Sequence, residues 1–216
     1  MATSELFEQL DFQENPLYEK LIQDLMEDQY SVTDAFFTEE EVLLLRNSLL
    51  EKYENDAFKK SAVGSRVNEL IASGIRGDFI KWIDEQEANE AEQLFFHKIN
   101  SLVNYLNKTC FMGILQKEFH YAVYPKGTFY KRHLDTFRND DRRKLSFVCY
   151  LNDDSWEKEN GGELTLYLPE DKKERALDIY PLPGRVVLFE SQLLEHEVKT
   201  VKHSKRLSIT GWLKTR

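Results

Sequence analysis

Two histidines and one aspartate, His133, Asp135 and His196, constrain the fold of this chain more than any other feature. Two imidazoles and one carboxylate can occupy one face of an octahedral metal and leave the opposite face open, the arrangement expected of non-haem Fe(II) oxygenases. His133 and Asp135 are separated by one residue, whereas His196 is far along the chain. The fold must therefore return a distant segment to His133. Arg206, ten residues after His196, suggests an anionic co-substrate beside the metal.

The spacing of His133 and Asp135 predicts that both lie on one β-strand. Side chains at positions i and i+2 of a strand project to the same side, so a strand over residues 129–135 would point both into one interior. The third ligand can come from a distant strand if the sheet closes into a barrel. A histidine and an aspartate at this spacing are weak evidence alone, and the full constellation is far more selective.

The last predicted strand, which begins at Arg206, alternates between two kinds of side chain. The apolar set is Leu207, Ile209 and Leu213, and the alternate set is Arg206, Ser208, Thr210 and Trp212. We interpret the alternate set as the lining of a ligand cavity and the apolar set as packed under helices. The alternative is an ordinary amphipathic edge strand with a surface arginine.

The first half of the chain is predicted to be mainly helical. Thr38 and Glu41 match a capping box, with Thr38 as N-cap and Glu41 at N3, which begins a helix reaching about residue 53. Apolar residues at helical spacing predict a second helix over about 88–107, and both helices are expected to cover the outer face of a sheet. The intervening residues 61–77 contain three glycines among polar residues, which favours a loop.

After Gly113 the apolar period changes to two residues, which indicates strands. Turn residues separate eight candidates, at residues 115–124, 129–135, 144–152, 163–168, 177–180, 185–189, 195–201 and 206–214. Eight short strands without intervening helices predict an all-β barrel or a double-sheet jelly roll. We therefore expect a mainly β chain with N-terminal helices and a single domain over 1–216. Residues 1–113 would supply helical support and a substrate loop, and 114–216 the catalytic barrel.

Several short motifs carry a resemblance to a known family. They are Tyr124-Pro125, Tyr130-Lys131-Arg132-His133, Tyr150-Leu151-Asn152, Gly161-Gly162-Glu163-Leu164, His196-Glu197-Val198 and Arg206-Leu207-Ser208-Ile209-Thr210-Gly211-Trp212. Ile75-Arg76-Gly77-Asp78, followed by Trp82, is similar to a segment upstream of that family's core. Residues 120–214 thus resemble the catalytic domain of the 2-oxoglutarate- and Fe(II)-dependent prolyl 4-hydroxylase superfamily. Within it, they look most similar to hypoxia-inducible-factor-type prolyl hydroxylases and their bacterial relatives. The family's double-stranded β-helix is the jelly roll expected here.

The resemblance implies a dioxygenase that couples hydroxylation to the decarboxylation of 2-oxoglutarate, giving succinate and CO2, with O2 as a substrate and ascorbate as reductant. Fe(II) would be held by His133, Asp135 and His196. Arg206 would bind the distal carboxylate of 2-oxoglutarate, because a guanidinium stays charged and offers a planar fork matched to two carboxylate oxygens. The other residues expected at the co-substrate are Tyr124, Tyr150, Leu164, Ser208 and Trp212.

The resemblance also implies a protein or peptide substrate, with a prolyl residue as the preferred target. We expect Asp78, Trp82 and Arg143 to contact it. Asp78 would pair with Arg143 or another basic residue of the loop 136–143, and Trp82 would support that anchor by packing. A surface Arg-Gly-Asp turn without function is the alternative. A free amino acid or another protein residue remains an alternative target on the same scaffold.

The other three histidines receive no metal role. His97 in the second helix and His203 in a basic turn are expected to be structural or exposed. His120 lies on the strand that leads into Tyr124, so it could face the cavity, although packing is favoured.

The net charge of −9 and the isoelectric point near 5.2 argue against general affinity for nucleic acid or anionic membranes. Basic clusters at residues 131–132, 142–144 and 199–206 flank the expected pocket and could attract an acidic substrate segment. Their alternative interpretation is solvated strand ends.

The chain shows no secretion signal and no apolar stretch of about 18 residues, the length a membrane span requires. Cys110 and Cys149 fit no metal or redox motif, and small buried thiols in a reducing compartment are expected. A cytoplasmic protein is therefore predicted, with a monomer favoured.

Three competing functions fit the pattern less well. A cupin-type metal enzyme usually carries two histidines one residue apart and a downstream glutamate, and no such histidine pair occurs here. The nucleic-acid dealkylating oxygenases commonly carry a second arginine six residues after the first, where this chain has Trp212. A non-catalytic binding module would not need the complete ligand set and Arg206.

Overall fold

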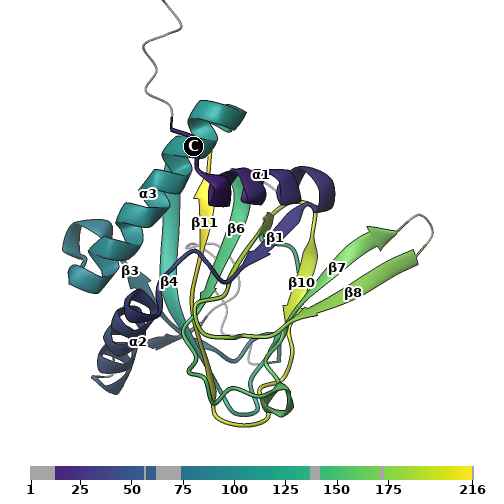
Figure 1. The fold of residues 1–216 in the computed structure, drawn as a ribbon. Helices are drawn as coiled ribbons and strands as arrows, with labels where there is room; N and C mark the ends of the chain where they lie inside the picture. The colour runs from purple at the N-terminus through teal and green to yellow at the C-terminus, as the bar shows by residue number, and fades with distance from the viewer. Residues whose placement is uncertain (1–12, 56, 62–73, 137–141, 171–172, 216) are drawn as a thin grey trace, which may run out of the picture.

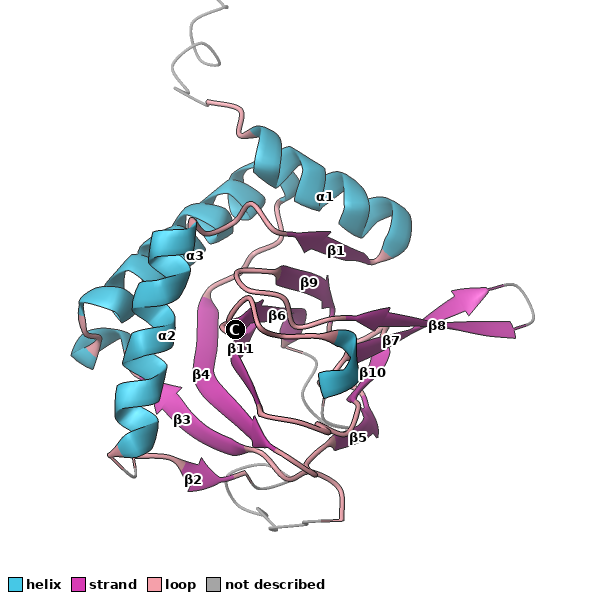
Figure 2. Cartoon of the chain, turned by 60° about the horizontal axis from the view of Figure 1, so that its bottom comes forward, coloured by secondary structure: helices cyan, strands magenta, loops and turns pink. Residues whose placement is uncertain are grey.

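Two antiparallel β-sheets face each other in this computed structural model, which describes residues 13–55, 57–61, 74–136, 142–170 and 173–215. The larger sheet has the strand order β1-β9-β6-β11-β4-β3-β2, and the smaller has the order β5-β10-β7-β8 (Figure 1; every strand is labelled in Figure 2). The large sheet is built from β1 (Tyr30–Thr33), β2 (Lys59–Lys60), β3 (Phe79–Ile83), β4 (Gln116–Pro125), β6 (Arg143–Tyr150), β9 (Val186–Glu190) and β11 (Lys205–Lys214). The small sheet is built from β5 (Tyr130–His133), β7 (Leu164–Glu170), β8 (Lys173–Ile179) and β10 (Glu195–Val198). The predicted jelly roll is confirmed.

Three α-helices, α1 (Pro16–Asp28), α2 (Glu39–Glu54) and α3 (Glu90–Cys110), lie on the outer side of the large sheet, and the small sheet lies on its other side (Figure 2). Two short 3-10 helices span Glu85–Glu87 and Lys158–Asn160. None of the described helices is long and apolar enough to cross a membrane.

The main core lies between these helices and the large sheet. Leu207, Ile209 and Leu213 of β11 are buried in it, as the alternation of that strand predicted. Phe95 of α3 packs edge-on against Phe119 of β4, with ring centroids 4.9 Å apart. Because the helices cover the outer face of the large sheet, its inner face can line a cavity between the two sheets.

The predicted start of α2 is confirmed at the level of single hydrogen bonds. Thr38 Oγ1 accepts from the Glu41 amide, and the Glu41 carboxylate accepts from the Thr38 amide, so the capping box is complete. The helix α3 begins two residues later than predicted because Asn89 forms its own capping box with Glu92. The eight strands expected after residue 113 all occur, with ends shifted by a few residues.

The prediction of a mainly helical first half was incomplete. The strands β1, β2 and β3 also come from this half and extend both edges of the large sheet. These strands are two to five residues long, too short for a clear period of two in the sequence. The helix α1 was also missed, although Asn15 caps it and Pro16 occupies its first turn. Residues 62–73 and 137–141 of the two predicted substrate loops lie outside the described residues.

Candidate metal centre and co-substrate pocket

The three predicted ligands come together between the two sheets. His133 at the end of β5 pairs in register with His196 of β10, so adjacent strands bring these two residues side by side. One ligand atom from each of His133, Asp135 and His196 lies within 4.8 Å of the others. The residue Asp135 is not on the predicted strand, because β5 ends at His133 and the chain then bends. That bend carries the carboxylate across to Ser146 of the other sheet.

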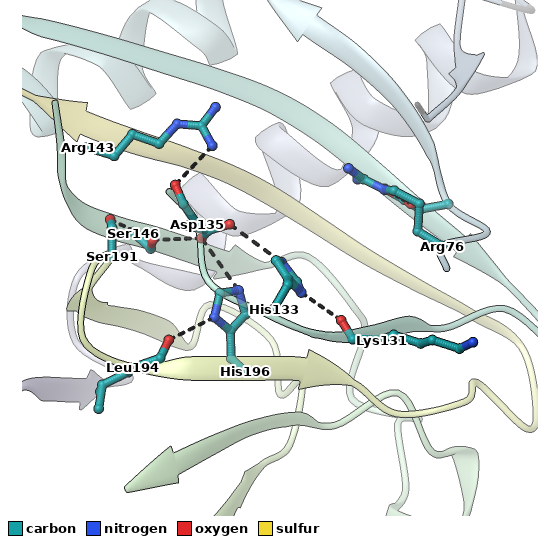
Figure 3. A network of polar contacts seen from close by, with 10 residues as sticks. Arg76, Lys131, His133, Asp135, Arg143, Ser146, Ser191, Leu194 and His196 are labelled. Carbon is teal, nitrogen blue, oxygen red and sulfur yellow. Dashed lines mark hydrogen bonds and ion pairs between the residues drawn. The ribbon is translucent and has the colours of Figure 1, made fainter. Parts of the chain in front are cut away.

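A hydrogen bond at the Nδ1 atom of each imidazole orients the opposite nitrogen, Nε2, which would coordinate a metal. The Nδ1 atoms of His133 and His196 lie 2.7 and 3.2 Å from the main-chain oxygens of Lys131 and Leu194 (Figure 3). A carbonyl oxygen can only accept, so these partners assign the proton of each neutral ring to Nδ1. Each Nε2 atom then presents its lone pair, and each lies 3.5 Å from one oxygen of Asp135. This is the support that metal-binding histidines usually have.

The electrostatics favour the protonation states that bind a metal. Burial by itself would raise the pKa of Asp135, but the neighbouring His196 and His133 and the hydrogen bond from Ser146 hold it below its usual range. Burial lowers the pKa of His196 to about 4, against the opposing effect of Asp135. The carboxylate is therefore ionised and His196 is neutral at neutral pH. Two imidazole nitrogens and one carboxylate oxygen suit Fe(II) with open positions.

Two residues that the sequence did not assign support this centre. Ser146 donates to Asp135 over 2.7 Å and lies 2.8 Å from the hydroxyl of Ser191 (Figure 3). The ring of Tyr130 stacks on His133 with centroids 3.7 Å apart. Ser146 is a polar residue between Leu145 and Phe147 on a buried strand. This pattern is the sequence signal that could have indicated its role.

The structure pairs Asp78 with Arg76 rather than with Arg143, and residues 137–141 of the loop that could have supplied another partner lie outside the described residues. Asp78 is fully buried and receives two hydrogen bonds from Arg76, of 2.8 and 2.5 Å. The guanidinium of Arg76 also lies over the ring of Tyr130, 4.3 Å from its centroid. Arg143 instead lies 3.5 Å from the ring centroid of Trp212, donates to the main-chain oxygen of Asp135, and approaches Glu118. Two residues that are two positions apart on one segment pair more readily than residues of separate loops.

A cavity of about 580 Å³ contains the ligand atoms and extends to Arg206. The side chain of Arg206 is buried, and its guanidinium lies between the rings of Tyr124 and Tyr150, 5.0 and 4.9 Å from their centroids. Its Nη1 donates to Ser208, while its Nε has no hydrogen-bond partner in the described part of the chain. No carboxylate of the described residues forms a salt bridge with it either. A buried cation without a counter-charge is costly, so this site fits the carboxylate of a ligand.

The surroundings of Arg206 fit the same ligand. The hydroxyl of Tyr150 is buried without a partner among the described residues, and burial raises the pKa of Tyr124 and Tyr150, so both phenols remain protonated donors. Leu164 lines the cavity as an apolar contact. Gly162 has φ of 75°, and a Cβ there would lie 3.3 Å from Cδ of Arg206. This glycine leaves the space in which the arginine is positioned.

Of the remaining residues predicted to contact ligands, some line the cavity and others contact the residues that line it. Trp82, Arg143 and Trp212 line the cavity, whereas Ser208 contacts Arg206 from behind. His120 packs against Trp82, as favoured, and also lines the cavity, the alternative that the sequence left open.

The predictions for the other histidines and for the basic clusters had different outcomes. His97 and His203 are exposed, as expected. Each basic cluster contains at least one residue with an acidic neighbour, because Arg132 pairs with Glu174 and Glu195, Arg143 approaches Glu118, and Lys199 pairs with Glu197.

Comparison with known proteins connects this geometry to a family. The model of the 2OG-Fe(II) oxygenase superfamily matches residues 119–214. A PKHD-type hydroxylase of Crocosphaera subtropica is 33% identical over 186 residues, which cover 80% of this chain and 78% of that protein. A PKHD-type hydroxylase of Synechococcus sp. is 40% identical over 92 residues, a match that spans only 41% of this chain and 38% of that relative.

Two solved structures share nearly the whole fold. A prolyl-4-hydroxylase of Pseudomonas putida superposes with a TM-score of 0.81 at 34% identity, covering 93% of this chain and 100% of the other. A prolyl hydroxylase of Trichoplax adhaerens, in complex with a peptide fragment of the hypoxia inducible factor oxygen degradation domain, also gives a TM-score of 0.81. It is 27% identical, and the match covers 92% of this chain and 89% of that one.

Proposed function

The chain belongs to the 2OG-Fe(II) oxygenase superfamily, and on that premise we propose that it hydroxylates a prolyl residue of a protein or peptide. The family match and the hydroxylase relatives confirm the prediction of a 2-oxoglutarate-dependent dioxygenase. The proposed reaction couples the hydroxylation to the conversion of 2-oxoglutarate and O2 to succinate and CO2.

One observation carries the co-substrate assignment. Arg206 is a buried guanidinium without a carboxylate partner in the described residues, at the end of a cavity that begins at three metal-ligand side chains. A dicarboxylic acid can bind this arginine through one end and present its other end to the metal position. 2-Oxoglutarate has this chemistry.

Each residue of the site has a role in this proposal. His133, Asp135 and His196 would hold Fe(II), which supplies the redox chemistry of O2 when it is bound. Ser146 and the carbonyl of Leu194 fix the orientations of Asp135 and His196.

The residues around Arg206 would complete the co-substrate site. Arg206 would bind the distal carboxylate of 2-oxoglutarate, and its burial excludes the water that would otherwise compete for the guanidinium. Tyr124 and Tyr150 would donate hydrogen bonds to co-substrate oxygens, and Leu164 would pack on the methylene groups.

The prolyl target is supported by the two prolyl hydroxylases with similar structures, one of which was solved with a bound peptide fragment. Ascorbate is proposed as the reductant that maintains Fe(II). A reducing compartment such as the cytoplasm is proposed for this protein. Cys149 is a buried free thiol, as expected, whereas Cys110 is exposed and the expectation of burial was wrong for it. We propose that the active form is a monomer, because one chain supplies all three ligand side chains and Arg206.

Mass spectrometry of a lysate treated with the enzyme tests which residue is hydroxylated. The purified protein is incubated with Fe(II), 2-oxoglutarate, ascorbate and a lysate of its source organism, and peptides that gain one oxygen atom are mapped by mass spectrometry. The matched control is the Asp135→Ala variant, which removes background oxidation from the comparison. Enzyme-dependent modification of proline is the expected result. Modification of another residue, or succinate production stimulated only by free amino acids, would replace the prolyl assignment with the corresponding alternative.

A further inference from the structure

A bulge in the small sheet places Tyr130 and His133 on the same side of β5. Residues three apart on a regular strand point to opposite faces of the sheet, because the side chains alternate. Here the register with β10 shifts, since the three-residue step from Tyr130 to His133 is matched by a two-residue step on the partner strand. Such a bulge redirects a side chain. The two rings therefore stack face to face, with centroids 3.7 Å apart and an angle of 19° between their planes.

A second backbone segment lies against this pair of rings. The amide of Gly77 donates to the main-chain oxygen of Phe129 over 3.0 Å. Arg76 is directly opposite Tyr130 in the same short antiparallel bridge. The approach is close, because a Cβ at Gly77 would lie 2.9 Å from the Cβ of Thr128. The main chain therefore brings Arg76 to Tyr130 independently of their side chains.

The guanidinium of Arg76 covers the other face of the Tyr130 ring. It lies 4.3 Å from the ring centroid. His133 is stacked on the same ring at 3.7 Å, so the two groups cannot share one face, and Tyr130 is held between them. Two hydrogen bonds from Arg76 to the fully buried Asp78, of 2.8 and 2.5 Å, fix the guanidinium in place. The ion pair has no net charge, so it can lie near a metal site without repelling the cation.

The stack restrains His133 in a way that its hydrogen bond does not. The contact between Nδ1 and the main-chain oxygen of Lys131 fixes one edge of the ring, but the ring can still tilt about this bond. His133 is the last residue of β5 and its side chain is 19% exposed, so the rest of the chain encloses it incompletely. A ring stacked face to face prevents the tilt. This matters because a metal ligand is effective only when its donor atom is aimed at the metal.

We propose that Arg76 is a positioning residue for the metal ligand His133, and that it acts through the ring of Tyr130. Asp78 holds the arginine, the arginine holds the Tyr130 ring against the imidazole, and the imidazole keeps Nε2 aimed at the metal position. The metal affinity of the site thus depends on a salt bridge that supplies no metal ligand. This inference rests on the metal centre of the proposed function, and it is independent of which residue the enzyme hydroxylates.

Titration with Co(II) tests the proposal, because Co(II) is stable in air and its visible absorption bands respond to the geometry of its ligands. Each protein is titrated without 2-oxoglutarate, which gives the Co(II) affinity and the absorption spectrum of the loaded site. Tyr130→Leu removes the ring, whereas Tyr130→Phe keeps the ring and removes only the hydroxyl.

The salt bridge is removed by a double substitution, Arg76→Gln with Asp78→Asn, which leaves no buried charge unpaired. This double substitution is made in the natural protein and in the Tyr130→Leu background. Arg76→Lys replaces it if the double variant does not fold, because lysine keeps the charge but loses the planar group over the ring.

Tyr167→Leu is the matched control. The guanidinium of Arg132 lies 3.8 Å from the centroid of the Tyr167 ring, so this is the same kind of contact within the small sheet. The hydroxyl of Tyr167 lies 2.6 Å from the carboxylate of Glu197, and neither partner is a metal ligand. Thermal unfolding of the metal-free proteins checks that every variant is folded.

The expected result is a Co(II) affinity about three- to tenfold lower in Tyr130→Leu, the effect of one aromatic contact, together with a changed absorption spectrum. Tyr130→Phe should match the natural protein, and removal of the salt bridge should lower the affinity by about the same three- to tenfold. In the Tyr130→Leu background, removal of the salt bridge should have no further effect, because Arg76 acts through the ring. Tyr167→Leu should bind Co(II) as the natural protein does.

An unchanged Co(II) affinity and spectrum in folded Tyr130→Leu would overturn the proposal, and so would an equal loss in Tyr130→Phe or in Tyr167→Leu. Equal effects of removing the salt bridge with and without the Tyr130 ring would show that Arg76 does not act through this ring. An error in the metal centre itself looks different, because His196→Ala would then bind Co(II) as tightly as the natural protein.

Discussion

The hydroxyl of Ser146 donates a 2.7 Å hydrogen bond to Asp135, although the two residues belong to different parts of the barrel. Ser146 is on β6 of the large sheet, and Asp135 follows β5 of the small sheet. This contact connects the two sheets at the metal centre and orients a carboxylate that the bend after His133 would otherwise leave free to rotate.

Ser146→Ala should therefore weaken Fe(II) binding while the three ligands remain present. Hydrogen-bond partners of metal ligands typically contribute about 10- to 100-fold in metal affinity. Anaerobic titration of Fe(II) gives the dissociation constant. Ser191→Ala is the control because it contacts Ser146 and not Asp135, and it should have the smaller effect. An unchanged Fe(II) affinity in Ser146→Ala would show that the bend alone positions the carboxylate.

Alanine substitution of His133, Asp135 or His196 should abolish turnover and reduce the Fe(II) stoichiometry, without unfolding the protein. The core is built from the hydrophobic side chains of the sheets and helices, so we expect the barrel to stay folded without any one of these three residues. Succinate formation, bound iron and the melting temperature are measured on each variant. Full succinate production by any one of them would defeat the assignment of the ligands.

Arg206→Lys should raise the apparent KM for 2-oxoglutarate. Lysine keeps a positive charge but loses the planar fork, and a lost charge-assisted hydrogen bond is worth about 1.5–3 kcal/mol. The expected increase is about 10- to 100-fold. Steady-state kinetics with varied 2-oxoglutarate check this, with iron affinity as the internal control. A KM equal to that of the natural protein would move the carboxylate site elsewhere.

Two glycines with similar positive φ angles separate the role of Gly162 from a general effect on folding. Gly162 and Gly127 have φ values of 75° and 84°, but a Cβ would meet Val201 and Arg206 at Gly162 and nothing within 4 Å at Gly127. Both alanine variants should lose stability, because this backbone region disfavours residues with a Cβ. Only Gly162→Ala should also weaken 2-oxoglutarate binding. Equal 2-oxoglutarate affinities in the two variants would contradict the proposed positioning of Arg206.

The buried His120 predicts an acid-sensitive stability. Its pKa falls from 6.5 to about 3 on folding, so at intermediate pH the unfolded chain binds a proton that the folded chain does not. The stability of the metal-free protein should be greatest above pH 6.5 and decline as the pH falls from there towards 3. At pH about 5 the loss from this residue is roughly 2 kcal/mol.

Denaturant unfolding at several pH values measures this effect. The His120→Phe variant lacks this titrating group and retains all the others. It should therefore lose less stability than the natural protein between neutral and acidic pH. Parallel pH profiles for the two proteins would contradict a neutral buried imidazole.

Local sequence patterns predicted the structural elements that are determined by residues close together in the sequence. The capping box at Thr38 and the alternation of β11 each specify one element, and the structure contains both. The ligand triad was predictable because its chemistry restricts the choice of residues. By contrast, β3 was missed because its pairing with β4 depends on residues far away in the sequence.

The errors within the site have the same origin. Asp78 was assigned to Arg143 because the sequence does not show which of several arginines is near, and the structure places Arg76 beside it. The unpartnered state of His120 depends on the burial that three strands create together. The pairing of Asp78 and the missing hydrogen-bond partner of His120 among the described residues depend on the folded cavity, so no local sequence pattern indicates them.

Binding of 2-oxoglutarate to the protein with and without Fe(II), measured by calorimetry in the absence of O2, tests the central claim most directly. The three ligands and Arg206 form one site only if the co-substrate contacts both the metal and the guanidinium. The account predicts one 2-oxoglutarate per chain on the Fe(II)-loaded protein, with much weaker binding to the metal-free protein and to Arg206→Lys. Equal affinity with and without Fe(II), or binding indifferent to Arg206→Lys, would contradict it.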